Sequence, residues 1–193
     1  MNPHHQSVIS SVFGEHKGTP SVFSFLLDHF SEVEFKSHEL IVEAGNVEKY
    51  FYLVLSGVQA IYLINAKGEK VILGFSYQGS PSGVFDSFIT QKPSSLFLEA
   101  LTDSAMLRLS KDQFDVVFER FPELYMWRTH FIEHILFGRL SRERELLTNT
   151  AKERFDLFMQ RCPKELLQIP QKYLASYLHM QPETFSRLRA ERD

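Results

Sequence analysis

Hydrophobic positions recur with different periods in three successive parts of the chain. In the first part they are spaced as on one face of a helix with 3.6 residues per turn, which predicts a helix over residues 20–31. The residues on that face are Val22, Phe23, Leu26, Leu27 and Phe30.

The second part, from about Glu32 to Leu109, has short apolar runs separated by turn residues, a pattern typical of strands. Gly45, Gly57, Gly68 and Gly79 punctuate it at intervals of 12, 11 and 11 residues, and each can take a positive φ in a turn. This spacing predicts a small barrel or sandwich, with residues 66–69 as a hairpin tip. The expected strands are residues 39–43, 51–55, 58–64, 70–75, 96–101 and 105–109.

The third part is helical and opens with a long helix over residues 122–148, in which Pro122 suits the first turn. Its apolar residues form two stripes, so the helix must be covered on two sides. One side can pack on the barrel and the other on the same helix of a second subunit, although a central helix in a monomeric bundle is the alternative. The predicted dimerisation residues are Trp127, Phe131, Ile132, Ile135, Leu136 and Leu140.

Residues 171–188 have the pattern of two short helices that cross at a tight turn. Leu174 and Leu178 lie four apart on the first helix, and the small Ala175 lets a second helix approach closely. Phe185 and Leu188 lie three apart on the second helix. Together they predict a helix-turn-helix.

The outward face of the second helix carries side chains suited to reading DNA. Arg187 can bind guanine bidentately, whereas Arg189 points about 200° away, towards the flank that meets phosphate. The alternative is an ordinary helical hairpin with a solvated face, and His179 stands at a turn position commonly held by Gly. The predicted DNA-binding residues are Gln181, Pro182, Glu183, Thr184, Ser186, Arg187 and Arg189.

Charge is distributed in a way that favours this interface. The net charge is −3, but residues 1–138 carry 10 Lys and Arg against 16 Asp and Glu, whereas residues 139–193 carry 11 against 8. An acidic body with a basic end is expected where one end meets phosphate, although a scatter of solvated charges would look similar.

Several function classes are disfavoured. Cys162 is the one cysteine among 193 residues, so an internal disulfide, a zinc knuckle or a cysteine-held iron–sulfur cluster is excluded. No apolar run reaches membrane-spanning length and no signal peptide is recognisable, which favours a cytoplasmic protein without membrane contact. No P-loop, HExxH or GxSxG motif is present, so we expect no enzyme, no cofactor and no metal, and we interpret His4 and His5 as part of a disordered tail.

Residues 20–189 resemble the cyclic-AMP receptor (Crp/Fnr) family of bacterial regulators. The segments that carry the resemblance are HELIVEAGNVEKYFYLVLSGVQAIYL, GEKVILGFSYQGSPSGVFDSF and, most specifically, IPQKYLASYLHMQPETFSRLR. The resemblance implies a β-roll sensor, a long dimerisation helix and a winged helix-turn-helix in which Glu183 and Arg187 read bases. Pro182 replaces a further base-reading Arg of the cyclic-AMP binders, so the resemblance implies a different operator. The resemblance implies a wing after residue 189, and we expect that wing to be reduced or absent.

The resemblance also implies an effector site at Gly83, Val84, Ser94 and Ser95. In the cyclic-AMP binders, the residue at Val84 is a Glu that holds the ribose and the residue at Ser94 is an Arg that neutralises the phosphate. A phosphate without its guanidinium loses a charge-assisted bidentate contact. We therefore expect that cyclic AMP does not bind tightly.

The resulting prediction is an α+β protein with three parts. Residues 1–121 form a β-roll sensor domain like a cyclic nucleotide-binding domain, residues 122–148 the dimerisation helix, and residues 149–193 the helix-turn-helix domain. The expected function is sequence-specific transcription regulation by a homodimer on double-stranded DNA, with RNA polymerase and an unknown small-molecule effector as further partners. The alternative is a ligand-sensing or protein-interaction module that has lost DNA binding.

Overall fold

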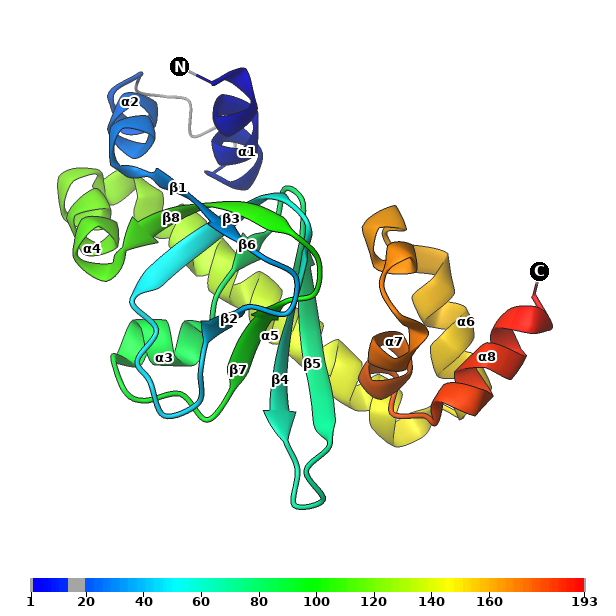
Figure 1. Cartoon of the computed structure of the whole chain (residues 1–193). Coiled ribbons are helices and arrows are strands. Elements are labelled where there is room, and N and C mark those ends of the chain that lie inside the picture. The colour runs from blue at the N-terminus through cyan, green and yellow to red at the C-terminus, as the bar shows by residue number, and fades with distance from the viewer. Residues whose placement is uncertain (1, 14–19, 193) are drawn as a thin grey trace.

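The computed structural model describes residues 2–13 and 20–192, which form a β-roll with helices at one end, a long helix and a C-terminal helical unit (Figure 1). The strands are β1 (Ser31–Phe35), β2 (Leu40–Val42), β3 (Tyr50–Ser56), β4 (Val58–Ile64), β5 (Lys70–Tyr77), β6 (Pro81–Ser82), β7 (Phe97–Ala100) and β8 (Ser104–Ser110). The helices are α1 (Pro3–Phe13), α2 (Pro20–His29), α3 (Phe85–Thr90), α4 (Lys111–Arg120), η1 (Pro122–Leu124), α5 (Tyr125–Thr148), α6 (Ala151–Arg161), η2 (Lys164–Gln168), α7 (Gln171–Tyr177) and α8 (Pro182–Ala190).

The β-roll consists of two four-stranded antiparallel sheets, in the orders β1-β8-β3-β6 and β2-β7-β4-β5. The predicted strands are confirmed, with ends shifted by at most two residues. The sequence reading missed β1, whose acidic residues are exposed, and β6, which has only two residues. These strands exist because β8 and β3 offer them backbone partners, a tertiary cause that local pattern does not reveal.

Glycines turn the roll at the predicted positions. Gly45, Gly57, Gly68 and Gly79 all have φ between 79° and 93°. Gly57 is also required by space, because an added Cβ would lie 2.3 Å from the hydroxyl oxygen of Ser104. A larger residue there would push β8 away from the β3–β4 turn.

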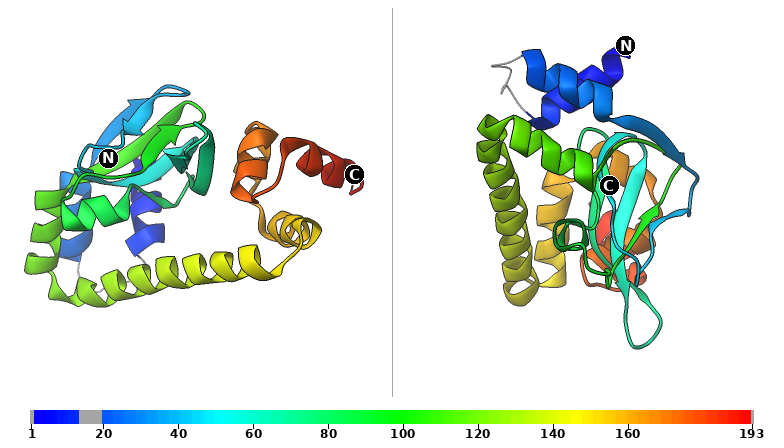
Figure 2. Two further views of the ribbon diagram at one scale, coloured as in Figure 1. Left: turned by 90° about the horizontal axis from the view of Figure 1, so that it is seen from below. Right: turned by 90° about the vertical axis from the view of Figure 1, so that its left-hand side faces the viewer.

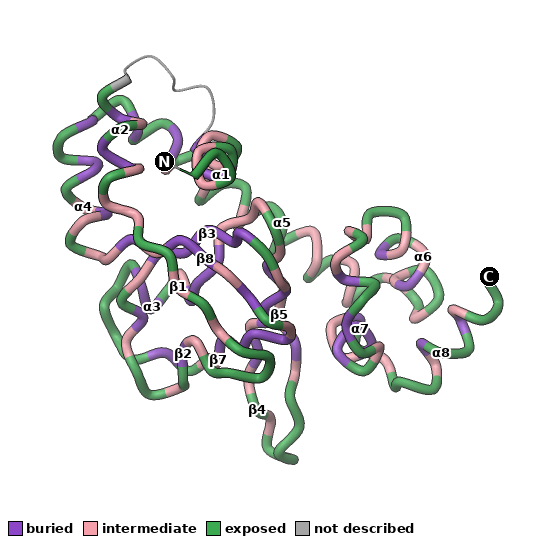
Figure 3. The backbone as a smooth tube through the Cα atoms, turned by 45° about the horizontal axis from the view of Figure 1, so that its top comes forward, coloured by how far each residue is buried: buried purple, intermediate pink, exposed green. Residues whose placement is uncertain are grey.

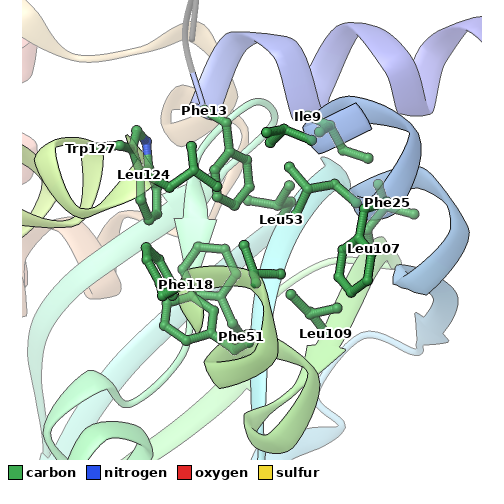
Figure 4. Close-up of a cluster of buried hydrophobic side chains, with 14 of the residues drawn as sticks. Ile9, Phe13, Phe25, Phe51, Leu53, Leu107, Leu109, Phe118, Leu124 and Trp127 are labelled. Atoms are coloured by element: carbon green, nitrogen blue, oxygen red, sulfur yellow. The ribbon is translucent and has the colours of Figure 1, made fainter. Parts of the chain in front are cut away.

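A core rich in aromatic side chains, which we call the aromatic core, holds the N-terminal helices, α4 and the start of α5 against β3 and β8 (Figure 4). Trp127 of α5 stacks on Phe13 with ring centroids 4.4 Å apart, and its indole N–H donates to the Val12 carbonyl at 2.7 Å. Phe51 and Phe118 pack around the same indole. This contact ties the first helix of the chain to the fifth.

Residues 3–13 form a helix, contrary to the prediction for His4 and His5. We expected His4 and His5 to lie in a disordered tail, but both belong to α1. Val8, Ile9 and Phe13 recur on one face of that helix and are buried, which explains why the helix docks on the roll. The second helix is confirmed but ends at His29, because Ser31 begins β1.

The predicted long helix is confirmed as η1 followed by α5. Viewed from below, α5 runs under the roll and carries the chain to α6–α8 (Figure 2). Trp127 is the buried residue of α5, where the helix meets the aromatic core; residues 136–140 are all exposed, and half-buried residues recur over 141–146 (Figure 3).

Candidate nucleic-acid interface and effector cavity

Helices α7 and α8 form the crossing pair expected for residues 171–188, here called the two-helix unit. Leu174, Ala175 and Leu178 are buried in the pair, together with Phe185 and Leu188, which confirms the predicted apolar contact. The Ala175 carbonyl accepts from the Met180 N–H at 3.1 Å, a hydrogen bond that closes the turn between α7 and α8. The predicted burial pattern therefore produces a close crossing of the two helices.

The turn between the helices has the strained backbone expected at its His. His179 has a φ of 52°, in the left-handed region that favours glycine. Arg154 of α6 holds the turn, because its guanidinium donates to the carbonyls of Leu178, His179 and Asn149 at 2.9, 3.1 and 2.6 Å. Partial burial, aided by the charges of Arg142 and Arg154, lowers the pKa of His179, so the imidazole is neutral at pH 7.

Sequence reasoning did not identify Arg154 as part of the site. Its only local sign was its position one residue after Glu153, which completes the capping box that begins α6 at Thr150. A capping box fixes where a helix begins but not which carbonyls a later arginine meets.

The face of α8 opposite its buried residues is polar. Gln181, Pro182, Glu183, Ser186 and Arg187 are exposed. Thr184 and Arg189 are half-buried on the two flanks of α8. Thr184 was predicted to lie on the outward face with Arg187, but it lies at the edge of that face. The guanidinium of Arg187 pairs at 3.8 Å with Glu191, and both side chains are exposed, so the pair is easily broken.

The two-helix unit is attached to the edge strand β5 of the roll. The Ser176 hydroxyl accepts from the Ile72 N–H at 3.1 Å and donates to the Lys70 carbonyl at 2.9 Å. Arg142 of α5 donates to the Tyr177 carbonyl at 2.6 Å, with its guanidinium 3.7 Å from the centre of the Tyr177 ring. Burial lowers the pKa of Arg142. Arg142 therefore connects α5 to α7.

A cavity of about 610 Å³ lies at this junction, between the roll, α5 and α7, and we call it the roll cavity. Its volume is in the range of small-molecule sites. Apolar side chains such as Ile61, Leu73 and Phe85 line it together with Ser76 and Ser82 from the roll. Asp86, His134, Arg139, Arg142 and Tyr177 supply the other polar groups.

Of the four predicted effector residues, only Gly83 lines the roll cavity. Val84 is fully buried in a small cluster with Val42 and Leu98. Ser94 is buried and its hydroxyl is engaged locally, donating to the Leu96 carbonyl at 3.0 Å and accepting from the Leu96 N–H at 2.8 Å. Ser95 is exposed. The assignment of Val84, Ser94 and Ser95 to one site with Gly83 is therefore not supported by the geometry.

The carboxyl group of Glu48 is buried close to the backbone of Val84. Glu48 is 1 % exposed and accepts from the Tyr50 N–H at 3.0 Å, while the Ser87 hydroxyl accepts from the Glu48 N–H at 3.0 Å. Burial raises the pKa of Glu48 to about 7, despite the backbone hydrogen bonds that oppose the shift. Sequence reasoning missed this residue, since one Glu between strands resembles a solvated charge.

The predicted dimerisation residues separate into three environments. Trp127 is buried and Phe131 is half-buried in the subunit's own aromatic core, so both serve its fold, and Ile135 lines the roll cavity. Ile132, Leu136 and Leu140 are 42 %, 51 % and 50 % exposed on the opposite face of α5. With Leu147, two turns further along, they form a line of apolar side chains that we call the outer stripe.

Within residues 2–13 and 20–192, no group of three His, Cys, Asp or Glu side chains is placed to hold a metal ion. The helices of that same part include none long and apolar enough to cross a membrane. Cys162 is a free, half-buried thiol whose pKa burial raises.

Comparison with known proteins supports the fold. Residues 32–121 match the family model of the cyclic nucleotide-binding domain. No curated protein sequence matches the chain.

Among solved structures, FixK2 from Bradyrhizobium japonicum is similar with a TM-score of 0.76 and 18 % identity, over 84 % of this chain and 83 % of that one. The c-di-GMP-responsive global regulator CLP of Xanthomonas campestris has a TM-score of 0.71 and 15 % identity, over 90 % and 91 %. The sensor domain of the transcriptional regulator DNR from Pseudomonas aeruginosa has a TM-score of 0.59 and 18 % identity, over 71 % and 91 %. At such identities the similarity establishes the fold: an α+β chain whose roll is similar to a cyclic nucleotide-binding domain.

Proposed function

We propose that this protein is a homodimeric transcription regulator of the Crp/Fnr type, which binds double-stranded DNA through α8 and senses a small molecule through the roll. The observation that carries the proposal is the polarity of α8, whose inner face is buried while Glu183, Ser186 and Arg187 project outward. Similarity to CLP and to the DNR sensor domain supports a regulatory role. The proposal includes no enzymatic activity.

In this proposal α8 enters the major groove with Arg187 towards the base edges. Arg187 lies four residues after Glu183, so both project from one helical face, and an arginine there can bind guanine O6 and N7. Arg189 is half-buried on the flank, where a guanidinium meets the phosphate backbone. Around Arg187 and Arg189 lie the remaining predicted DNA contacts: Gln181, Pro182, Thr184 and Ser186.

A dimer follows from the outer stripe. Four apolar side chains aligned along one helix expose surface that a second copy of α5 would cover, and a two-fold pair is the commonest assembly. Two recognition helices related in this way reach successive major grooves, roughly 34 Å apart. The dimer therefore predicts an operator with two similar half-sites.

The test begins with selection of bound fragments from a random duplex library, followed by fluorescence anisotropy on the best site and its single-base variants. Arg187→Ala should cost about 1–3 kcal/mol on the best site and relax the preference at one base pair in each half-site. Arg189→Ala should weaken all sequences about equally and make the salt dependence shallower. Lys67→Ala removes the same charge at the tip of the β4–β5 hairpin and should change neither property.

If Arg187→Ala leaves the ranking of the single-base variants unchanged, base reading by Arg187 is wrong. If the wild-type protein binds no duplex at low salt, the alternative replaces the proposal: a ligand-sensing or protein-interaction module built on the roll. The acidic body, with 10 Lys and Arg against 16 Asp and Glu over residues 1–138, is the feature that favours this alternative.

A further inference from the structure

Ser82 and Ser76, which line the roll cavity, belong to a chain of buried hydrogen bonds. The Ser82 and Ser76 hydroxyl oxygens are 2.7 Å apart, and Ser76 is 3.1 Å from Oε1 of Gln59. Nε2 of Gln59 donates to the Ser104 hydroxyl at 2.9 Å, and Ser104 is 2.8 Å from the Thr102 carbonyl. All four side chains, from β4, β5, β6 and β8, are buried.

The direction of every hydrogen bond in this chain is determined by its far end. The Thr102 carbonyl can only accept, so the Ser104 hydroxyl donates its one proton to it and must accept from the Gln59 amide. The Gln59 oxygen then faces Ser76, which spends its own proton there. Ser82 must therefore donate to Ser76, and this leaves only lone pairs of Ser82 to face the roll cavity.

The wall formed by α5 carries the positive charge. Arg139 and Arg142 of α5 are the Lys or Arg side chains among the described residues that line the roll cavity. Arg139 donates one N–H to the Leu73 carbonyl at 2.9 Å, so the rest of its exposed guanidinium can meet an anion. His134 is a further potential donor, and Asp86 is the acidic residue of this lining.

Much of the remaining lining is apolar. Ile61, Leu73, Phe75, Phe85 and Leu98 contribute hydrocarbon surface to the roll cavity. A ligand segment of matching character gains from leaving water there, whereas a polar one would lose its hydrogen bonds. The cavity therefore combines an acceptor on the roll, apolar walls and the cationic side chains of α5, which we call the cationic rim.

We propose that the roll cavity binds a small organic acid with an apolar body, whose carboxylate meets Arg139 and whose far end carries a hydroxyl or N–H group that donates to Ser82. The inference names the effector class of the proposed regulator and rests on its sensor role. Binding is measured without DNA, so its failure and the failure of DNA binding are separate results.

Tyr177 gives such a ligand a route to the two-helix unit. Its ring lines the cavity and also packs on the Arg142 guanidinium, which donates to the Tyr177 carbonyl. An acid at the cationic rim competes with this contact for the charge of Arg142. Occupancy therefore alters the attachment of α7 to α5.

The test uses isothermal titration calorimetry with ω-hydroxycarboxylates from hexanoate to dodecanoate, because a series of lengths allows one member to span the cavity. Each is compared with the plain carboxylate of equal length, which lacks the donor, and with the ω-hydroxy primary amide, which lacks the charge. The best hydroxy acid should bind about tenfold more tightly than its plain counterpart, the effect of one buried acceptor left unsatisfied. It should also bind more tightly than the amide and than cyclic AMP.

Two matched pairs of variants assign the ends. Ser82→Ala should bring the hydroxy acid down to the affinity of the plain acid, whereas Ser95→Ala, an exposed serine outside the cavity, should change nothing. Arg139→Gln should weaken both acids several-fold but not the amide, whereas Arg144→Gln, exposed on the same helix and outside the lining, should weaken neither.

The wild-type protein alone decides the proposal if a variant fails to fold. Equal affinity for hydroxy and plain acids, equal affinity for acid and amide, tighter binding of cyclic AMP, or no binding of the whole series at millimolar concentration would each overturn it.

Discussion

The roll and the two-helix unit are both built around buried aromatic side chains, but they differ in what they expose. The aromatic core of the roll is covered by α1, α2, α4 and α5, so that its rings contact one another from several directions. Phe185 of the two-helix unit packs edge-on against Phe155 of α6, while the other side of α8 is polar. This difference predicts that substitutions in the aromatic core mainly change the free energy of unfolding, whereas substitutions on the outer face of α8 mainly change DNA binding.

The largest effect is expected at Trp127, where α1 and α5 meet on the roll. Trp127→Ala should lower the free energy of unfolding by about 3–5 kcal/mol, because it removes a buried ring and leaves the Val12 carbonyl without its donor. Circular dichroism during chemical denaturation measures this effect, since Trp127 is the one tryptophan and its fluorescence is lost.

Tyr125→Ala is the matched control, because Tyr125 is on the same helix but 49 % exposed. It should cost less than about 1 kcal/mol. If the two variants are equally stable, the roll does not depend on the aromatic core in the way its geometry indicates.

Glu48 provides the next largest effect and gives the roll a pH dependence. Its folded pKa of about 7 lies above the usual 4.5, so the folded state holds the proton longer than the unfolded state. Stability from this group is therefore present at low pH and is lost as pH rises from 4.5 to 7, by up to about 3 kcal/mol. Glu48→Gln should remove that loss and keep an oxygen for the Tyr50 N–H.

The measurement is the difference in unfolding free energy between wild type and Glu48→Gln across this pH range. The exposed Glu43→Gln serves as control and should follow wild type. A difference that stays constant with pH would mean that the Glu48 carboxyl ionises as it would in water.

The outer stripe separates the two regions in another way, because it should affect assembly without affecting either core. Leu136→Glu should raise the dimer dissociation constant at least about 100-fold, since it places a charge on the proposed interface, and should leave the subunit folded. Val116→Glu, at a similarly exposed apolar residue of α4, is the control. Sedimentation that shows the wild type as a monomer at tens of micromolar would contradict the dimer.

How far the sequence predicts each region follows from how local its causes are. The helices α7 and α8 depend on apolar spacing within eighteen residues, so Leu174, Phe185 and the outward Arg187 could be identified directly. Most strands of the roll were equally readable from short apolar runs and glycine turns. Helix α1 also has a local sign, the apolar spacing of Val8, Ile9 and Phe13, although the sequence-based prediction did not include this helix.

The roll cavity has no such local cause. Ser82, Arg139 and Tyr177 come from distant segments that meet only through the packing of the roll, α5 and α7. The resemblance located Gly83 at the cavity, but it could not reveal that Ser94 turns its hydroxyl to Leu96. Gln59 had one sign that could be read beforehand, a polar side chain among the apolar residues of a strand.

The smallest effect tests the two-helix unit itself, at the turn whose backbone is strained. His179 has a φ of 52°, where a residue with a side chain pays about 1–2 kcal/mol. His179→Gly removes this strain but loosens the unfolded chain, so a net gain of about 0.5–1 kcal/mol is expected in hydrogen-exchange protection of α7 and α8. The backbone contacts to Ser176 and Arg154 survive the change, because both use main-chain atoms of residue 179. His179→Ala separates strain from the loss of the imidazole, since alanine keeps the strain and should not gain stability. If glycine and alanine behave alike, the turn is unstrained. If glycine also changes the DNA sequence preference, the turn does more than support α8.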